Sequence, residues 1–130
     1  MLGGAIGDAM GNPVEYDSFE KIKERYGSKG ISNLLIVNGV AQVTEDTQLS
    51  IFTADGIIKS ARKQGDDNKI PDMRDIYESY QDWLKTQKRK YLPTQKGWIS
   101  NIKEINSKRA SGLICTPFLE SGMPGSIEFP

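Results

Sequence analysis

The sequence predicts an all-α fold, built as a bundle of helices. Apolar residues recur at helical spacing in two stretches, Asp46–Lys63 and Met73–Gln87. Gly65, which can end a helix, follows the first stretch, and Asp72, which can cap a helix, precedes the second. The remaining segments are expected to be short helices and loops.

The front of the chain is expected to contain two short helices. Small residues dominate Ala5–Gly11, which we interpret as the end of a helix. A second helix is predicted over Phe19–Tyr26, because Ser18 is a favourable N-cap and Gly27 is a favourable stop. Glycines surround an apolar patch within residues 28–43, which predicts a loop with one short extended piece.

The two long helices are expected to carry apolar stripes. The stripe of the first helix consists of Leu49, Phe52, Ile57 and Ala61, joined by Ile51, Ala54 and Ile58. The stripe of the second consists of Met73, Ile76, Tyr77, Tyr80, Trp83 and Leu84. Aromatic residues at this spacing are far more often core than part of a cofactor site, so we interpret the second stripe as core.

The last third of the chain is expected to be less regular. Pro93 breaks the chain within Leu92–Gly97. A short helix is then predicted from Trp98, Ile102 and Ile105, with Ser100 or Asn101 as its cap. Glycines and prolines after residue 110 leave room only for a turn or two of helix around Pro117–Ser121.

Length and charge narrow the class of protein. A chain of 130 residues has the size of one ordinary domain and can bury a hydrophobic core, so we expect a single domain over residues 1–130. Lysine plus arginine and aspartate plus glutamate both total 17, which argues against a nucleic-acid-binding surface. The densest basic run, Lys85–Lys90, is interpreted as a solvated helix end.

Cysteine and histidine usage exclude several kinds of chemistry. The single cysteine, Cys115, excludes an internal disulfide framework and favours a reducing compartment, so we expect a cytoplasmic location. No apolar run approaches the roughly 20 residues of a membrane span. The chain has no histidine, which excludes Ser-His-Asp triads and HExxH zinc sites. Any catalysis must therefore use carboxylates, hydroxyls, lysines or a hard metal held by oxygen.

Thr44-Glu45-Asp46-Thr47 is the first candidate for chemistry, because two carboxylates and two hydroxyls stand at the start of a predicted helix. Helix N-termini offer free N–H groups and positive potential, which suit carboxylates. Clustered oxygen ligands suit Mg²⁺, Mn²⁺ or Ca²⁺ rather than zinc. Taken alone, the pattern is more typical of a helix cap, with Thr44 as the N-cap and the acids facing the helix dipole.

Two other features precede this cluster. Glu15 follows a turn-like segment and is a candidate general base, although a solvated acid is the simpler interpretation of the residue alone. Residues 3–11 contain a Gly-x-x-Gly spacing but lack the context of a phosphate-binding loop. Close packing through small residues is the favoured interpretation there.

Together these motifs resemble the ADP-ribosylglycohydrolases, the group that includes the dinitrogenase-reductase-activating glycohydrolase. Residues 3–15, which contain Gly7-Asp8-Ala9 and Pro13-Val14-Glu15, are similar to the opening signature of the family. Residues 43–57 are similar to its second signature, normally Thr-Asp-Asp-Thr-Gln before a helix. Residues 106–126 also match the middle of the family, so the resemblance covers nearly the whole chain in the expected order.

The resemblance implies an all-α fold and a pair of divalent metals, usually Mg²⁺ and alternatively Mn²⁺, between helices. It implies hydrolysis of the N- or O-glycosidic bond that joins ADP-ribose to a protein side chain or a small acceptor. The implied partner is an ADP-ribosylated protein or an ADP-ribose-containing small molecule. The metal ligands would be Thr44, Glu45 and Asp46, the catalytic residue Glu15, and the supporting, substrate-binding residue Asp8.

Two features depart from the family pattern. Glu45 stands where the family usually has aspartate, and the extra methylene moves the carboxylate by roughly 1.5 Å, one C–C bond. Mg²⁺ tolerates such a change in geometry badly. The later Asp-x-Asp-Thr-type motif of the family and its glycine/serine-rich diphosphate-binding segment lie beyond these 130 residues. We therefore expect a bundle that is incomplete at its C-terminal side and hydrolysis that is impaired in the short chain.

Two alternatives stay open at this stage. The chain is a non-catalytic homologue that binds ADP-ribose or metal, or it is a helical interaction module in which residues 44–47 only cap a helix. In each case, uncovered apolar faces are expected to cause self-association. Neither a nucleic acid nor a membrane is expected as a partner.

Overall fold

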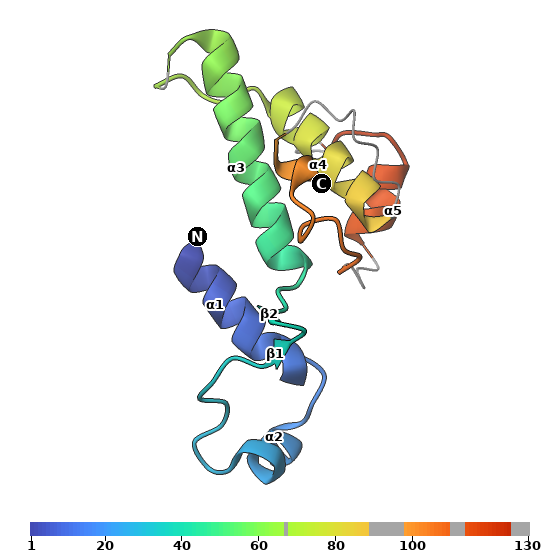
Figure 1. The fold of residues 1–130 in the computed structure, drawn as a ribbon. Coiled ribbons are helices and arrows are strands. Elements are labelled where there is room, and N and C mark those ends of the chain that lie inside the picture. Colours follow the sequence, from blue (N-terminus) through green and yellow to red (C-terminus); the bar gives the residue numbers. More distant parts are fainter. Residues whose placement is uncertain (67, 89–97, 110–113, 126–130) are drawn as a thin grey trace. The chain divides into compact units, whose positions relative to one another are not determined.

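The computed structural model describes residues 1–66, 68–88, 98–109 and 114–125, and it is mostly helical (Figure 1). This confirms the all-α prediction. The chain divides into two compact units, Met1–Thr47 and Gln48–Pro130. The elements in chain order are α1 (Leu2–Gly11), η1 (Asn12–Val14), α2 (Phe19–Tyr26), β1 (Ile36–Val37), β2 (Val40–Ala41), α3 (Glu45–Gln64), α4 (Met73–Gln87), η2 (Ile99–Asn101) and α5 (Cys115–Glu120).

The short helices of the first unit form for local reasons. The side chain of Ser18 accepts a hydrogen bond from the backbone N–H of Lys21 at 3.4 Å, which caps α2 as predicted. Gly27 ends the helix with a φ of 79°, a conformation that suits glycine. Helix α1 begins at Leu2, three residues before the predicted segment, and continues into the 3-10 turn η1.

The extended piece expected within residues 28–43 is an antiparallel hairpin. Val37 pairs with Val40 in the register between β1 and β2. The two-residue loop between them, Asn38-Gly39, has φ values of 52° and 80°. An Asn-Gly pair with two positive φ angles is the favoured hairpin turn, since it matches the twist of the strands. This Asn-Gly pair is a local signal from which the sequence alone predicts a hairpin.

Helices α3 and α4 cross closely in the second unit. A Cβ atom built on Gly56 of α3 would lie 2.5 Å from the Cα of Ile76 in α4. Only glycine therefore allows the two backbones to approach this closely. Gly65 follows α3 with a φ of 64°, and the Asp72 side chain caps α4 by accepting from the N–H of Arg74 at 2.9 Å. Both helix ends were predicted.

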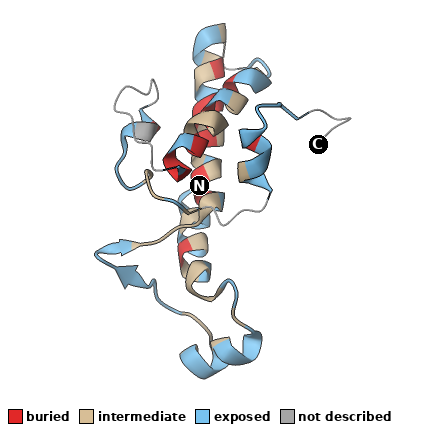
Figure 2. Ribbon diagram, turned by 90° about the vertical axis from the view of Figure 1, so that its right-hand side faces the viewer, coloured by how far each residue is buried: buried red, intermediate tan, exposed pale blue. Residues whose placement is uncertain are grey.

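The hydrophobic core of the second unit is small and lies on α3, α4 and the segments after them (Figure 2). The core interpretation of the second stripe was wrong for Met73, which is 70% exposed. Ile57 and Ile58 of the first stripe are each 41% exposed. The period of a helix assigns residues to a face, but the position of the neighbouring helix decides which face is buried. The buried core residues are Phe52, Trp83, Leu84, Ile99 and Leu119.

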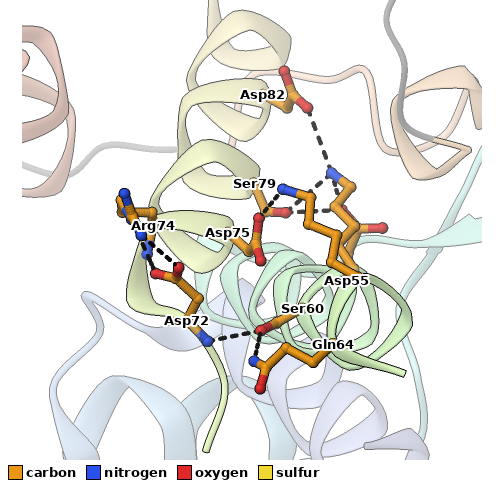
Figure 3. A network of polar contacts seen from close by, with 10 residues as sticks. Asp55, Ser60, Gln64, Asp72, Arg74, Asp75, Ser79 and Asp82 are labelled. Carbon is orange, nitrogen blue, oxygen red and sulfur yellow. Dashed lines mark hydrogen bonds and ion pairs between the residues drawn. The ribbon is translucent and has the colours of Figure 1, made fainter. Parts of the chain in front are cut away.

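A polar seam, which includes Asp55, Lys59 and Ser79, also joins α3 to α4 (Figure 3). Asp55 is only 2% exposed and pairs with Lys59 at 2.6 Å. The hydroxyl of Ser79 donates to Asp55 at 2.9 Å and accepts from Lys59 at 3.1 Å. These polar groups can be buried because each charge has an ion of opposite sign and the hydroxyl both donates and accepts a hydrogen bond.

The same seam continues toward the end of α3. The ammonium group of Lys63 donates to the carboxylate of Asp75, and this hydrogen bond raises the pKa of Lys63. The hydroxyl of Ser60 accepts from the backbone N–H of Asp72 at 2.7 Å and from the side-chain amide of Gln64 at 2.8 Å (Figure 3). The start of α4 is thus hydrogen-bonded to the last turns of α3.

The short helix predicted from Trp98, Ile102 and Ile105 is not formed. The chain makes only the 3-10 turn η2, which ends at Ile102 with an extended ψ of 116°. Ile99 and Ile105 pack on the core across turns rather than along one helix face. The predicted turn of helix near Pro117–Ser121 is α5, which begins two residues earlier, and the break at Leu92–Gly97 lies outside the described residues.

Two other expectations concern solvent and membrane. The side chains of Lys85 and Lys88 are exposed at the end of α4, as predicted, and Arg89 and Lys90 lie outside the described residues. Within the described ranges, no helix combines the length and the apolar character that crossing a bilayer requires.

Candidate functional site

Asp8 of α1 is hydrogen-bonded to the start of α3. Its Oδ2 atom accepts hydrogen bonds from the backbone N–H of Thr44 at 2.9 Å and from the hydroxyl of Thr47 at 2.5 Å. Asp8 is partly buried, and Thr47 is 9% exposed. The first N–H groups of a helix have no partner within it, so a carboxylate at this place stabilises the helix start. The structure therefore joins the two segments that the resemblance singled out.

The environment of Asp8 favours its charged form. Burial acts to raise the pKa of Asp8, but the hydrogen bonds from Thr47 and Thr44 outweigh it, and the net pKa lies below the usual value. The carboxylate is thus ionised at neutral pH. It supplies a fixed negative charge at the head of α3.

Thr44 caps α3, as expected if residues 44–47 are taken only as a helix start. Its hydroxyl oxygen accepts from the backbone N–H of Asp46 at 3.2 Å. This bond leaves a further lone pair on the hydroxyl oxygen. Capping and metal binding are therefore compatible uses of the same side chain.

Glu45 and Asp46 form the first turn of α3. Asp46 is exposed and Glu45 is partly exposed. Neither carboxylate makes a hydrogen bond or an ion pair with any residue that the structure describes. Both carboxylates are therefore open to a ligand from solvent.

Glu15 lies in the same unit, directly after η1. Its side chain is exposed, and within the described ranges its carboxylate has no hydrogen-bond or ion-pair partner. Its backbone N–H donates to the carbonyl of Asn12 at 3.4 Å. Asn12 in turn donates from its side-chain amide to the carbonyl of Gln42 at 3.0 Å, which links the Glu15 turn to the segment before Thr44. Asn12 is a structural residue of this region that no sequence motif indicated, and Thr47, a hydroxyl of the predicted cluster, binds Asp8.

The oxygen donors can be compared with the needs of a divalent cation. Thr44, Glu45 and Asp46 offer one hydroxyl and two carboxylates on one helical turn, and these hard oxygen atoms suit Mg²⁺ or Mn²⁺. Among the described residues, no three acidic, cysteine or histidine side chains gather as a metal-binding group. The donor chemistry fits such a cation, but the donor set is that of a half-site.

A cavity of about 470 Å³ lies in the second unit and contains none of the predicted site residues. Aromatic and aliphatic side chains of α4 and α5 form most of its wall, among them Tyr77, Tyr80 and Phe118. Cys115, which is exposed, is another of its lining residues. Its lining shows an apolar surface on this unit, separate in residues from the oxygen-donor cluster.

Comparisons with known proteins bear on this arrangement. The family model described as ADP-ribosylglycohydrolase matches residues 1–121 of the 130 residues. The match includes α1, the Glu15 turn and the whole of α3. Searches among curated proteins and among solved structures gave no match.

Proposed function

Because this chain belongs to the ADP-ribosylglycohydrolase family, we propose that it takes part in metal-dependent hydrolysis of the glycosidic bond between ADP-ribose and a protein side chain or small acceptor. The observation that supports this most directly is the pair of hydrogen bonds from Thr44 and Thr47 to Asp8. They connect the two family signatures and leave the carboxylates of Glu45 and Asp46 open to a ligand.

Thr44, Glu45 and Asp46 are the residues that would hold Mg²⁺ or Mn²⁺. A bound cation would orient the hydroxyl groups of the ribose and lower the pKa of a water molecule, chemistry that needs no histidine. Asp8 keeps the donors in place by fixing the backbone before and within the first turn of α3. In this proposal its support of the substrate site is indirect, through Thr44 and Thr47.

Glu15 is the proposed general base. Cleavage of a glycosidic bond passes through an oxocarbenium-like state, which is stabilised by nearby negative charge and attacked by an activated water. An exposed carboxylate with no competing partner among the described residues is free to accept a proton from that water. The bond between Asn12 and Gln42 supports this role, since it restrains the turn that carries Glu15.

The small number of carboxylates in the proposed cation site favours weak cation binding, and it therefore bears on whether the chain hydrolyses its substrate or only binds it. Two acids and one hydroxyl hold a cation less tightly than a full set of six oxygen ligands does. Glu45 also replaces the aspartate that is usual in the family. We therefore propose impaired hydrolysis for this chain by itself, with a non-catalytic module that binds ADP-ribose or metal as the alternative.

The test is the release of ADP-ribose from ADP-ribosyl-arginine in the presence of Mg²⁺. We expect slow multiple turnover in the wild type and none in Asp46→Ala, with Glu78→Ala, an exposed acid of α4, as the matched control. Equal background rates in the wild type and Asp46→Ala would remove the catalytic proposal. Saturable binding of ADP-ribose without turnover would establish the binding module instead.

The substrate class and the location belong to the same proposal. We propose an ADP-ribosylated protein or an ADP-ribose-containing small molecule as the partner, in agreement with the family. A cytoplasmic location is proposed from the lone cysteine, Cys115, whose thiol is free and exposed.

A further inference from the structure

Gln48, which follows Thr47 in the first turn of α3, uses every hydrogen-bonding group of its side-chain amide. It is 1% exposed. Its Nε2 atom donates to the carbonyl oxygens of Ile105 and Ser107, both at 3.2 Å. Its Oε1 atom accepts from Nε1 of Trp83 at 3.1 Å and from Nε2 of Gln87 at 3.0 Å. A glutamine amide has two N–H groups and two lone pairs, so all four are used.

These bonds connect three segments of the second unit through one side chain. Trp83 and Gln87 belong to α4, and both are buried. Ile105 and Ser107 belong to the turns after η2. The network extends further, because Oε1 of Gln87 accepts from the backbone N–H of Arg109 at 2.8 Å. Gln48 is therefore fixed from two sides, by a helix and by a loop.

The place of Gln48 in α3 gives this anchor a consequence for the donors. Helix α3 begins at Glu45 and continues to Gln64, so Gln48 is in its first turns. Helix ends fray, and a first turn without an anchor samples other conformations. Since each residue of a helix is rotated by a fixed angle from the last, a fixed Gln48 also sets the direction of the side chains of Glu45 and Asp46 about the helix axis.

We propose that Gln48 is a positioning residue that pre-organises the donors Thr44, Glu45 and Asp46 for a divalent cation. The inference rests on the proposed function, because it assumes that these three residues bind the cation. Pre-organised ligands lose less conformational entropy on binding, and they hold the separation of their oxygen atoms within the narrow range that Mg²⁺ and Mn²⁺ require. Gln48 itself does not touch the cation in this scheme.

Another glutamine of the same unit provides the matched control. Gln81 of α4 is partly buried and donates from Nε2 to the carbonyl of Leu119 at 2.9 Å and to the hydroxyl of Tyr77 at 2.9 Å. It anchors α5 to α4, as Gln48 anchors the turns after η2 to α3. Replacing Gln81 by leucine therefore removes comparable bonds from the fold at a place outside α3.

The test measures Mn²⁺ binding to the 130-residue chain by the loss of the free-ion electron paramagnetic resonance signal. We expect Gln48→Leu to weaken binding at least tenfold, Gln48→Asn to weaken it by a smaller factor, and Gln81→Leu to leave it within twofold of the wild type. Gln48→Asn keeps the amide but shortens it by one methylene, so it decides the question if Gln48→Leu does not fold. Equal affinities in Gln48→Asn and Gln81→Leu would overturn the inference.

Amide hydrogen exchange separates this inference from the proposed function. If the wild type binds no Mn²⁺, the proposed function fails. Exchange at residues 49–51 then still decides whether Gln48 anchors the first turn of α3, since their N–H groups bond to the carbonyls of residues 45–47. Exchange at these amides that is at least fivefold faster in Gln48→Asn, and unchanged in Gln81→Leu, supports the anchor. Unchanged exchange in Gln48→Asn overturns it.

Discussion

The carboxylate of Asp8 accepts a 2.5 Å hydrogen bond from the hydroxyl of Thr47, a residue 39 positions further along the chain. The same oxygen atom accepts from the backbone N–H of Thr44 at 2.9 Å. Asp8 of α1, which carries the first family signature, thus caps α3, which carries the second. This relationship turns two separate motifs into one local structure. Between the two threonines lie the carboxylates of Glu45 and Asp46, which have no polar partner in the described part of the chain.

Removing the Asp8 carboxylate should destabilise the chain. We expect Asp8→Ala to lower the free energy of unfolding by about 1–2 kcal/mol, the usual effect of deleting a helix cap and its hydrogen bonds. Asp8→Asn should lose less, because its amide oxygen can still accept. Urea denaturation followed by circular dichroism measures both. The control is Asp17→Ala, which removes an exposed ion pair with Arg25. A loss in Asp8→Ala no larger than in the control would contradict the capping role.

The stability that Asp8 contributes should depend on pH. Its pKa is lowered in the folded state, despite burial, by hydrogen bonds from Thr47 and Thr44. The contribution is therefore fully present above the unfolded pKa of about 3.9 and is lost as the pH falls through the lower folded value. The difference in unfolding free energy between the wild type and Asp8→Asn should be constant from pH 5 to 7, the range above both pKa values, and should shrink below about pH 4. A difference that stays constant to pH 2.5 would count against this linkage.

A side chain at Gly56 should separate α3 from α4. The Cβ of Gly56→Ala would lie 2.5 Å from the Cα of Ile76, a backbone atom that cannot move independently of α4. We expect a loss of about 2–3 kcal/mol of unfolding free energy from this overpacking. Gly3→Ala in α1 is the control, because its Cβ would meet nothing within 4 Å. It should leave stability unchanged or raise it by about 0.5–1 kcal/mol through helix propensity. The opposite ranking of the two variants would refute the close crossing.

The exposed apolar residues near the hairpin should promote self-association. Leu35 is 52% exposed and Ile36 is 55% exposed. Two-stranded hairpins are marginally stable without a packed face, and clustered apolar surface favours association. We expect light scattering to show an apparent mass that rises with concentration, and Leu35→Lys to reduce that rise. The control is Asn33→Lys, which adds the same charge at an exposed polar position. A monomeric mass at all concentrations would exclude the effect.

The elements that the sequence predicted well are those with local causes. Helix α2 begins after Ser18 and ends before Gly27, and α4 covers Met73–Gln87, because their caps lie within a few residues of the helix ends. The hairpin could also have been predicted from the sequence, because its turn is the Asn38-Gly39 pair. The 3-10 turn η2 was not, since Ile99 and Ile105 reach the core through turns whose shape is set by packing.

Some features of the candidate site follow from the sequence, and others follow only from the tertiary structure. The sequence by itself determined which residue types stand together: hydroxyls and carboxylates at a helix start, no histidine to compete with them, and a family signature around them. These follow from neighbours in the chain and from composition. Only the tertiary structure decided that Asp8 accepts hydrogen bonds from Thr44 and Thr47 and that Gln48 is buried with all its hydrogen bonds satisfied. It also decided that Asp55 is buried and bonded to Ser79 of α4, while Ile57 and Ile58 are each 41% exposed. Such choices depend on contacts between residues more than 20 positions apart, whose free energy no local pattern encodes.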